Sequence, residues 1–322
     1  MTTTPGADPV ESRVVRVFRG EPLVEILAFV EAQLAAGATR LAFCVLDPDR
    51  GRGHHAGELV REDGIDHVHR PWRVWVDLAE RLGLRLATPR VVEPPLVELR
   101  FERLSRAADA TPLATADDLT EKYGAASAFA RVSKLEEPSF VVDFSEAVAR
   151  AKLPPTPRVL DLGVNTGDEL ALLRRLLPGA TFVGIDHSAS AIAIARARFP
   201  DASLHVADFA DLVSLELGSF DLVVSIGTLQ STGLDDRELV RQVVQRHLAP
   251  DGAVIFGFPN CRYVDGEIVY GTRMKNFRQP ELGLLVKDVA FYRKYLQQHE
   301  RQVFVTGKYY VLVTGVRIGS AT

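Results

Sequence analysis

The chain contains the segment Val159-Leu160-Asp161-Leu162-Gly163-Val164-Asn165-Thr166-Gly167, in which an apolar run ends at a glycine turn. The apolar run predicts a buried strand over 158–162. A helix is predicted over 167–177, directly after the turn. Glycine lets the backbone approach a ligand closely, and the N–H groups at a helix N-terminus favour anionic groups. The segment therefore predicts a ligand cradle between a strand and a helix.

A regular alternation of strands and helices follows this segment. Strands are predicted over 181–186, 203–207, 220–226 and 252–258, and helices over 188–198 and 235–248. This alternation is typical of a parallel sheet covered on both faces. After Pro259 we expect a long loop, then a helix with Leu285 and Leu296 on one face. The runs 302–306 and 309–318 are close enough to form a terminal hairpin, so the expected fold class is α/β.

Polar side chains lie at the carboxyl ends of the predicted strands. This is where open α/β sheets bind their ligands. They are Asp161, Asp186, Asp208 and Ser225. Asp186 can accept hydrogen bonds from both hydroxyls of a ribose. Phe209 can flank a base ring. His187 can stack on the same ring or simply cover the sheet edge.

Three kinds of nucleotide cradle were compared with the glycine turn. A phosphate-binding loop of the form GxxxxGK[ST] does not occur in the sequence. A dinucleotide fingerprint GxGxxG, aligned on Gly163, would need glycine where Asn165 and Asp168 stand. In the third kind, an acidic residue lies on the strand before the turn, as in Asp161-Leu162-Gly163.

Taken in this order and spacing, the series over about residues 121–322 resembles the class I S-adenosylmethionine-dependent methyltransferases. The resemblance implies a Rossmann-like sheet of seven mostly parallel strands with a C-terminal antiparallel hairpin, and S-adenosyl-L-methionine as the cofactor. It implies that Asp161, Gly163 and Gly167 line the methionine end of the cofactor. It also implies that Asp186 takes the ribose and Asp208 the adenine. The expected cofactor-binding residues are Asp161, Gly163, Asn165, Gly167, Asp186, His187, Asp208, Phe209 and Ser225.

The acceptor of the methyl group is expected to be a small metabolite. In-line methyl transfer is largely a positioning task, so no catalytic triad is expected and no catalytic residue is assigned. Candidate acceptor-binding residues come from three segments: Tyr123, Arg131, Thr228, Gln230, Asn260, Arg262, Tyr263 and Arg273. Arg262 and Arg273 favour an anionic acceptor, because guanidinium groups match carboxylate and phosphate. The alternative, a solvated basic loop, stays open.

A separate unit precedes this domain. We expect a loose tail over 1–11, a small α/β domain over 12–105 and a linker over 106–120. Its expected elements are strands at 13–18, 41–46, 85–92 and 96–104, helices from Leu23 and over 71–83, and a polar loop over 49–70. The loop region holds His54, His55, His67 and His69, whose spacing is not a zinc pattern. We therefore expect no metal there.

Composition limits the remaining alternatives. The net charge is −4 and neither end is strongly basic, so we do not expect a nucleic-acid partner. An RNA (tRNA) methyltransferase and a non-catalytic S-adenosylmethionine-binding regulatory protein remain the alternatives, and the glycine spacing disfavours a nicotinamide oxidoreductase. Two distant cysteines, no signal sequence and no membrane-spanning run predict a cytoplasmic address. A homodimer is compatible with the sequence.

Overall fold

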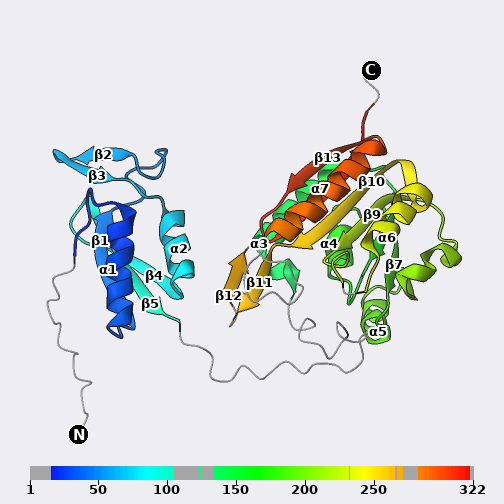
Figure 1. Ribbon diagram of the computed structural model, residues 1–322, viewed down its shortest axis with the longest axis horizontal. Coiled ribbons are helices and arrows are strands. Elements are labelled where there is room, and N and C mark those ends of the chain that lie inside the picture. Colours follow the sequence, from blue (N-terminus) through cyan, green and yellow to red (C-terminus); the bar gives the residue numbers. More distant parts are fainter. Residues whose placement is uncertain are drawn as a thin grey trace, which may run out of the picture. The chain divides into compact units, whose positions relative to one another are not determined.

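The computed structural model describes residues 16–104, 124, 133–231, 233–264, 267–270 and 282–319 (Figure 1). The chain divides into two compact units, 1–109 and 110–322, which are described separately below. The tail expected over 1–11 and the linker expected over 106–120 lie outside the described residues.

The first unit is a three-stranded antiparallel sheet with two helices. Its elements are α1 (Leu23–Ala35), β1 (Arg40–Leu46), β2 (Leu59–Glu62), β3 (Ile65–Val68), α2 (Trp72–Arg81), β4 (Leu84–Val91) and β5 (Leu96–Arg103). The sheet order is β1-β5-β4. Apolar residues of α1 and α2 pack with one face of the sheet, around Phe43, Trp75 and Phe101. The two helices predicted in this unit are confirmed.

One expectation for the first unit is wrong. The region 49–70 is not a continuous loop, because β2 and β3 pair there as an antiparallel hairpin. Asp63 and Gly64 both have positive φ, at 49° and 78°, which suits a tight hairpin turn. Of the strand expected over 13–18, residues 13–15 lie outside the described residues, and Val17 forms an isolated parallel bridge with Cys44.

The second unit is built on a seven-stranded sheet. Its helices and helical turns are η2 (Lys134–Glu136), α3 (Pro138–Arg150), α4 (Asp168–Leu176), α5 (Ala189–Arg198), η3 (Phe209–Leu215), α6 (Asp236–Gln242), η4 (Val243–His247) and α7 (Leu282–Gln298). Its strands are β6 (Arg158–Leu162), β7 (Thr181–Asp186), β8 (Ser203–Val206), β9 (Phe220–Ile226), β10 (Leu248–Pro259), β11 (Cys261–Val264), β12 (Glu267–Tyr270), β13 (Arg301–Thr306) and β14 (Tyr310–Arg317).

The strand order of this sheet is β13-β14-β10-β9-β6-β7-β8. The strands β6 to β10 run parallel, and β14 runs antiparallel to both of its neighbours. The predicted Rossmann-like sheet with its C-terminal antiparallel hairpin is therefore confirmed. Helices α3, α4 and α5 pack on one face, and α6 and α7 pack on the other (Figure 1).

Two further expectations need correction in this unit. The helix expected over 235–248 ends earlier: α6 gives way to the π-helical turn η4, and Leu248 already pairs with Phe220 in the sheet. The long loop expected after Pro259 contains the antiparallel pair β11 and β12. Both short strands are rich in β-branched and aromatic residues, which favour extended backbone.

No helix in the described part of the chain is long and apolar enough to cross a bilayer.

Candidate functional site

The polar residues of the second unit gather where the strand order reverses. From β6 the chain builds outward through β7 and β8 on one side, and through β9 and β10 on the other. Asp161 of β6 lies in register with Gly184 of β7 and Val224 of β9. Crevices at such reversal points are where open α/β sheets bind ligands.

The turn after β6 requires glycine at two positions. Gly163 has φ +85°, and a β-carbon there would lie 1.9 Å from the Thr228 Oγ1 atom. Gly167 has φ +90°, and a β-carbon there would lie 2.5 Å from the Phe199 ring. Both the backbone conformation and the space therefore exclude a side chain. The Thr228 and Phe199 side chains therefore pack directly on the backbone of the turn.

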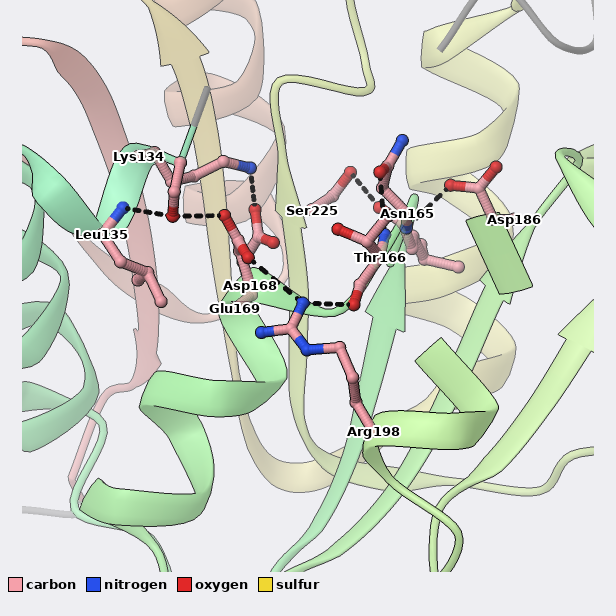
Figure 2. Close-up of polar contacts among 11 residues, drawn as sticks. Lys134, Leu135, Asn165, Thr166, Asp168, Glu169, Asp186, Arg198 and Ser225 are labelled. Carbon is pink, nitrogen blue, oxygen red and sulfur yellow. Dashed lines mark hydrogen bonds and ion pairs between the residues drawn. The ribbon is translucent and has the colours of Figure 1, made fainter. Parts of the chain in front are cut away.

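Asn165 holds the middle of this turn in a left-handed conformation, with φ +46°. Its N–H donates to Asp186 Oδ2 at 2.9 Å, and its side-chain Oδ1 accepts from the Thr166 N–H at 2.7 Å (Figure 2). Asparagine tolerates positive φ better than most residues with a side chain. Asn165 thus meets the backbone requirement that glycine meets elsewhere in the turn.

Asp161 is the most unusual group of the site. It is only 1% exposed, and neither carboxylate oxygen has a hydrogen-bond partner. Burial raises the pKa of Asp161 well above its usual value, and Glu169 and Asp186 raise it further, whereas Lys134 lowers it. A buried carboxylate without partners costs stability. Such a group at a ligand-binding edge is a strong candidate for a ligand contact.

Part of the hydrogen-bonding capacity of Asp186 is taken up by backbone N–H groups of the protein itself. Its Oδ2 accepts from the Asn165 N–H and its Oδ1 from the Ser188 N–H, each at 2.9 Å. A carboxylate has about four acceptor positions. Asp186 therefore both anchors the turn and keeps capacity for a ligand with two hydroxyl groups.

Ion pairs and hydrogen bonds surround the first turn of α4, next to the glycine turn (Figure 2). Lys134 of η2 forms an ion pair with the buried Glu169. Ser133 donates to Asp168 Oδ2 at 2.7 Å. Arg198 of α5 donates to the Thr166 carbonyl at 2.6 Å and contacts Asp168 at 3.4 Å. These bonds connect η2, which precedes the glycine turn, and α5, which follows it, to the turn and to α4.

The other predicted cofactor residues have visible structural roles. Ser225 is fully buried and donates to the Leu162 carbonyl at 3.2 Å, which links β9 to β6. Asp208 is exposed and caps η3 by accepting from the Ala210 N–H at 2.8 Å. Phe209 packs in the core cluster of this sheet face. The His187 Nε2 atom is buried without a hydrogen-bond partner.

Two predicted acceptor residues follow β9. Thr228 lies against Gly163. Gln230 is 6% exposed, and neither its amide oxygen nor its amide nitrogen has a partner. Asn260, at the end of β10, donates from Nδ2 to the Lys308 carbonyl at 3.0 Å. Gln230 therefore has both amide atoms left for a ligand, and the Oδ1 atom of Asn260 is also buried without a partner.

The remaining acceptor candidates are not described in side-chain detail. Tyr123, Arg131 and Arg273 lie outside the described residues. Arg262 and Tyr263 belong to β11, in register with Val269 and Ile268 of β12. Their assignment to the acceptor stays a prediction.

The histidines of the first unit lie in different surroundings. His67 and His69 are buried, and His54 pairs with Glu58 at 2.5 Å. Within the described ranges, no group of three or more His, Cys, Asp or Glu side chains could hold a metal ion.

Residues 160–254 match the family model described as "Methyltransferase domain". This segment is therefore similar to methyltransferase domains. It begins within β6 and ends within β10, so it contains the glycine turn and the ends of β6, β7, β8 and β9. Asp161, Asp186 and Gln230 all lie inside it.

Part of the chain is similar to curated enzymes. It is 34% identical over 119 residues to trans-aconitate 2-methyltransferase of Delftia acidovorans, covering 37% of this chain and 44% of that protein. It is 35% identical over 113 residues to the enzyme of the same name from Deinococcus radiodurans, covering 34% and 42%. The matched segment spans less than half the length of these relatives.

Solved structures of methyltransferases show more distant likenesses. DesVI of Streptomyces venezuelae matches with a TM-score of 0.40 and 21% identity, covering 59% of this chain and 98% of that one. The plantazolicin methyltransferase BpumL matches with a TM-score of 0.43 and 17% identity, covering 55% and 72%.

Two residues of the second unit have no clear sequence signal for their place beside the site. Glu169 follows the glycine turn but reads as an ordinary first-turn acid of a helix. Tyr310 starts β14, far along the chain, yet its ring centre lies 5.9 Å from Lys134 Nζ. A β-carbon on Gly227 would lie 3.6 Å from the same ring. Only the antiparallel last strand brings Tyr310 back to this edge.

Proposed function

We propose that this protein is an S-adenosylmethionine-dependent methyltransferase that acts on a small anionic metabolite. The single observation that carries the proposal is the buried, unpartnered Asp161 carboxylate beside a glycine turn in a methyltransferase domain. A group of this kind needs a cationic or hydrogen-bond-donating ligand to offset its burial.

The residues at the strand ends fit the chemistry of this cofactor. S-adenosylmethionine supplies an electrophilic methyl group on a sulfonium and carries an ammonium and a ribose. Asp161 would hold the ammonium, and the free acceptor capacity of Asp186 would hold the ribose hydroxyls. Gly163 and Gly167 give the turn its positive-φ backbone conformation, which a side chain at either position would disturb. Asp208, Phe209 and His187 are proposed around the adenine.

The acceptor is proposed to lie beside the loop after β9. Gln230 supports this, because its buried amide offers both a donor and an acceptor. Thr228, in the same loop, lies against Gly163 of the glycine turn. The similarity to trans-aconitate 2-methyltransferases favours a small polycarboxylate as the acceptor. Arg262 and Arg273 are proposed as further contacts to its carboxylate groups.

The chain's contribution to the reaction is proposed to be positioning. A carboxylate acceptor is already ionised at neutral pH, so no general base is needed to activate it. Gln230 and Thr228 would orient the nucleophilic oxygen and keep competing water out. Alignment of the two reactants can supply about 7–11 kcal/mol of the barrier reduction.

A panel of candidate methyl acceptors tests this function. Purified protein is incubated with methyl-labelled S-adenosylmethionine and trans-aconitate, other di- and tricarboxylates, neutral esters of the same acids, and unmodified tRNA. Label transfer to a carboxylate, absent for its neutral ester, is the expected result. Transfer to tRNA alone would overturn the proposed acceptor class, and transfer to nothing would favour the non-catalytic alternative.

The proposal extends to cellular location and assembly. We propose a cytoplasmic protein, which fractionation of expressing cells would test. A homodimer is proposed with it, and sedimentation velocity at several concentrations would test that assembly.

A further inference from the structure

Two carboxylates of the site are buried, and a lysine is paired with one of them. Asp161 is 1% and Glu169 2% exposed. Lys134 forms an ion pair with Glu169, and its own side chain is 24% exposed. Asp161 forms no hydrogen bond with Lys134 or with any other described residue. With all three groups ionised, this set would carry one uncompensated negative charge inside the protein.

The neighbouring charged groups do not remove this excess. Asp186 is negative, and its oxygens accept from the Asn165 and Ser188 N–H groups. Asp168, on the same turn of α4 as Glu169, is paired with Arg198 and Ser133. Burial raises the pKa of Asp161 most; among the described residues, Glu169 and Asp186 raise it further, and Lys134 is the one cation that lowers it.

The surroundings of Lys134 hold it in the charged state. Burial alone would favour the neutral amine, but Glu169, Tyr310 and Asp168 outweigh it and raise the pKa of Lys134. Lys134 therefore cannot supply or accept the proton that balances the set near neutral pH. Asp161 is the group on which a balancing proton would reside.

Resting on the proposed function, we infer that Lys134 and Glu169 are positioning residues that set the charge of Asp161, and that the cofactor's ammonium replaces a proton on Asp161 when it binds. Asp161–COOH and R–NH₃⁺ become the pair Asp161–COO⁻ and R–NH₃⁺, and one proton passes to the buffer. Burial, with Glu169 beside it, keeps Asp161 protonated in the free protein. Lys134 limits that effect, so the proton can still leave.

Proton release follows from linkage. At a pH below the pKa of Asp161 in the free protein, binding must expel the proton, so affinity should rise by about tenfold per pH unit. Above that pKa the carboxylate is already ionised, so affinity should level off. A site whose carboxylates are ionised throughout would release no proton, so its affinity would not rise with pH.

Calorimetric titration of the full chain with S-adenosylhomocysteine measures this directly, without turnover. Titrations at one pH in buffers of different ionisation enthalpy give the number of protons released, and a pH series gives its dependence. 5′-Methylthioadenosine is the matched ligand, because it keeps the nucleoside and lacks the ammonium. We expect proton release with the first ligand and none with the second.

Two variants should move the effect in opposite directions. Glu169→Gln removes the carboxylate that, with burial, keeps Asp161 protonated, so proton release should be confined to lower pH. Lys134→Met removes the cation that opposes it, so proton release should extend to higher pH. Glu136→Gln is the control, because Glu136 is exposed on the same η2 segment as Lys134. It should leave the pH dependence unchanged.

The outcomes separate this inference from the proposed function. Binding of S-adenosylhomocysteine without proton release at any pH would overturn the inference and leave the cofactor assignment standing. An equal effect of Glu169→Gln and Glu136→Gln would also overturn it. No binding of either ligand to the folded wild-type protein would overturn the proposed function and the inference with it.

Discussion

The Thr228 hydroxyl occupies the space beside Gly163 that a side chain would need: a β-carbon at position 163 would lie 1.9 Å from Oγ1. Thr228 follows β9 and Gly163 follows β6, two neighbouring strands of the sheet. The contact therefore joins the glycine turn, which is proposed to hold the cofactor, to the loop after β9, which is proposed to hold the acceptor. A change at either residue should reach both halves of the site.

Gly163→Ala should cost about 1–3 kcal/mol of unfolding free energy, because the new methyl group collides with Thr228 and residue 163 keeps a positive φ. Gly233→Ala is the matched control. Gly233 has φ +88° with no atom within 4 Å of a β-carbon, so it carries the conformational strain without the collision. Circular dichroism melting compares the two, and an equal loss in both would contradict the crowding at Gly163.

Asp161→Asn should separate stability from binding. The pKa of Asp161 is raised in the folded state, so the unfolded chain ionises first as pH rises. Asp161 therefore favours folding below its unfolded pKa of about 3.9, and this contribution is lost as pH rises through the folded pKa. In Asp161→Asn the decline of stability from acid to neutral pH should flatten, while cofactor affinity falls. Urea unfolding across pH measures the slope, and an unchanged slope would contradict the account.

Gln230→Leu should raise the acceptor KM without destabilising the fold. Its buried amide has no partner, and an unsatisfied buried polar group costs about 1–3 kcal/mol. An apolar side chain of similar length removes that cost, so the unfolding free energy should hold or rise. Steady-state kinetics should show the KM of the acceptor increase while that of the cofactor stays. A loss of stability with normal kinetics would assign Gln230 to packing instead.

The first unit should lose stability in mild acid. Burial lowers the pKa of both His67 and His69. The unfolded chain therefore takes up protons near pH 6.5 before the folded unit does, so stability is lost as pH falls below that value. The only two tryptophans, Trp72 and Trp75, lie in α2, so their fluorescence follows this unit. In His67→Gln/His69→Gln the acid-induced loss should shrink, and an unchanged acid transition would contradict this explanation.

The parallel sheet could be predicted closely because its signals are local. The apolar strand over 158–162 and the strand over 181–186 have the predicted bounds. Gly167 caps α4, as the glycine turn indicated. The hairpin of β2 and β3 was missed, although Asp63-Gly64 is a typical hairpin turn, because the surrounding residues are polar and only partly buried.

The ion pairs and hydrogen bonds around the first turn of α4 could not be predicted from local patterns. Lys134 and Glu169 are 35 residues apart, and their pairing depends on how η2 meets α4. Tyr310 reaches the same edge only because β14 runs antiparallel between β13 and β10. Such contacts follow from tertiary packing, for which the sequence offers no spacing rule.

Calorimetric titration with S-adenosylmethionine, using NADH as the control ligand, tests the central claim most directly. The wild-type chain should bind S-adenosylmethionine and not NADH, and Asp186→Ala should lose that binding because Asp186 is proposed to hold the ribose. Circular dichroism confirms that each sample is folded. A folded wild-type sample that binds no S-adenosylmethionine would contradict the account, because the strand-end acids would then serve only the protein's own backbone.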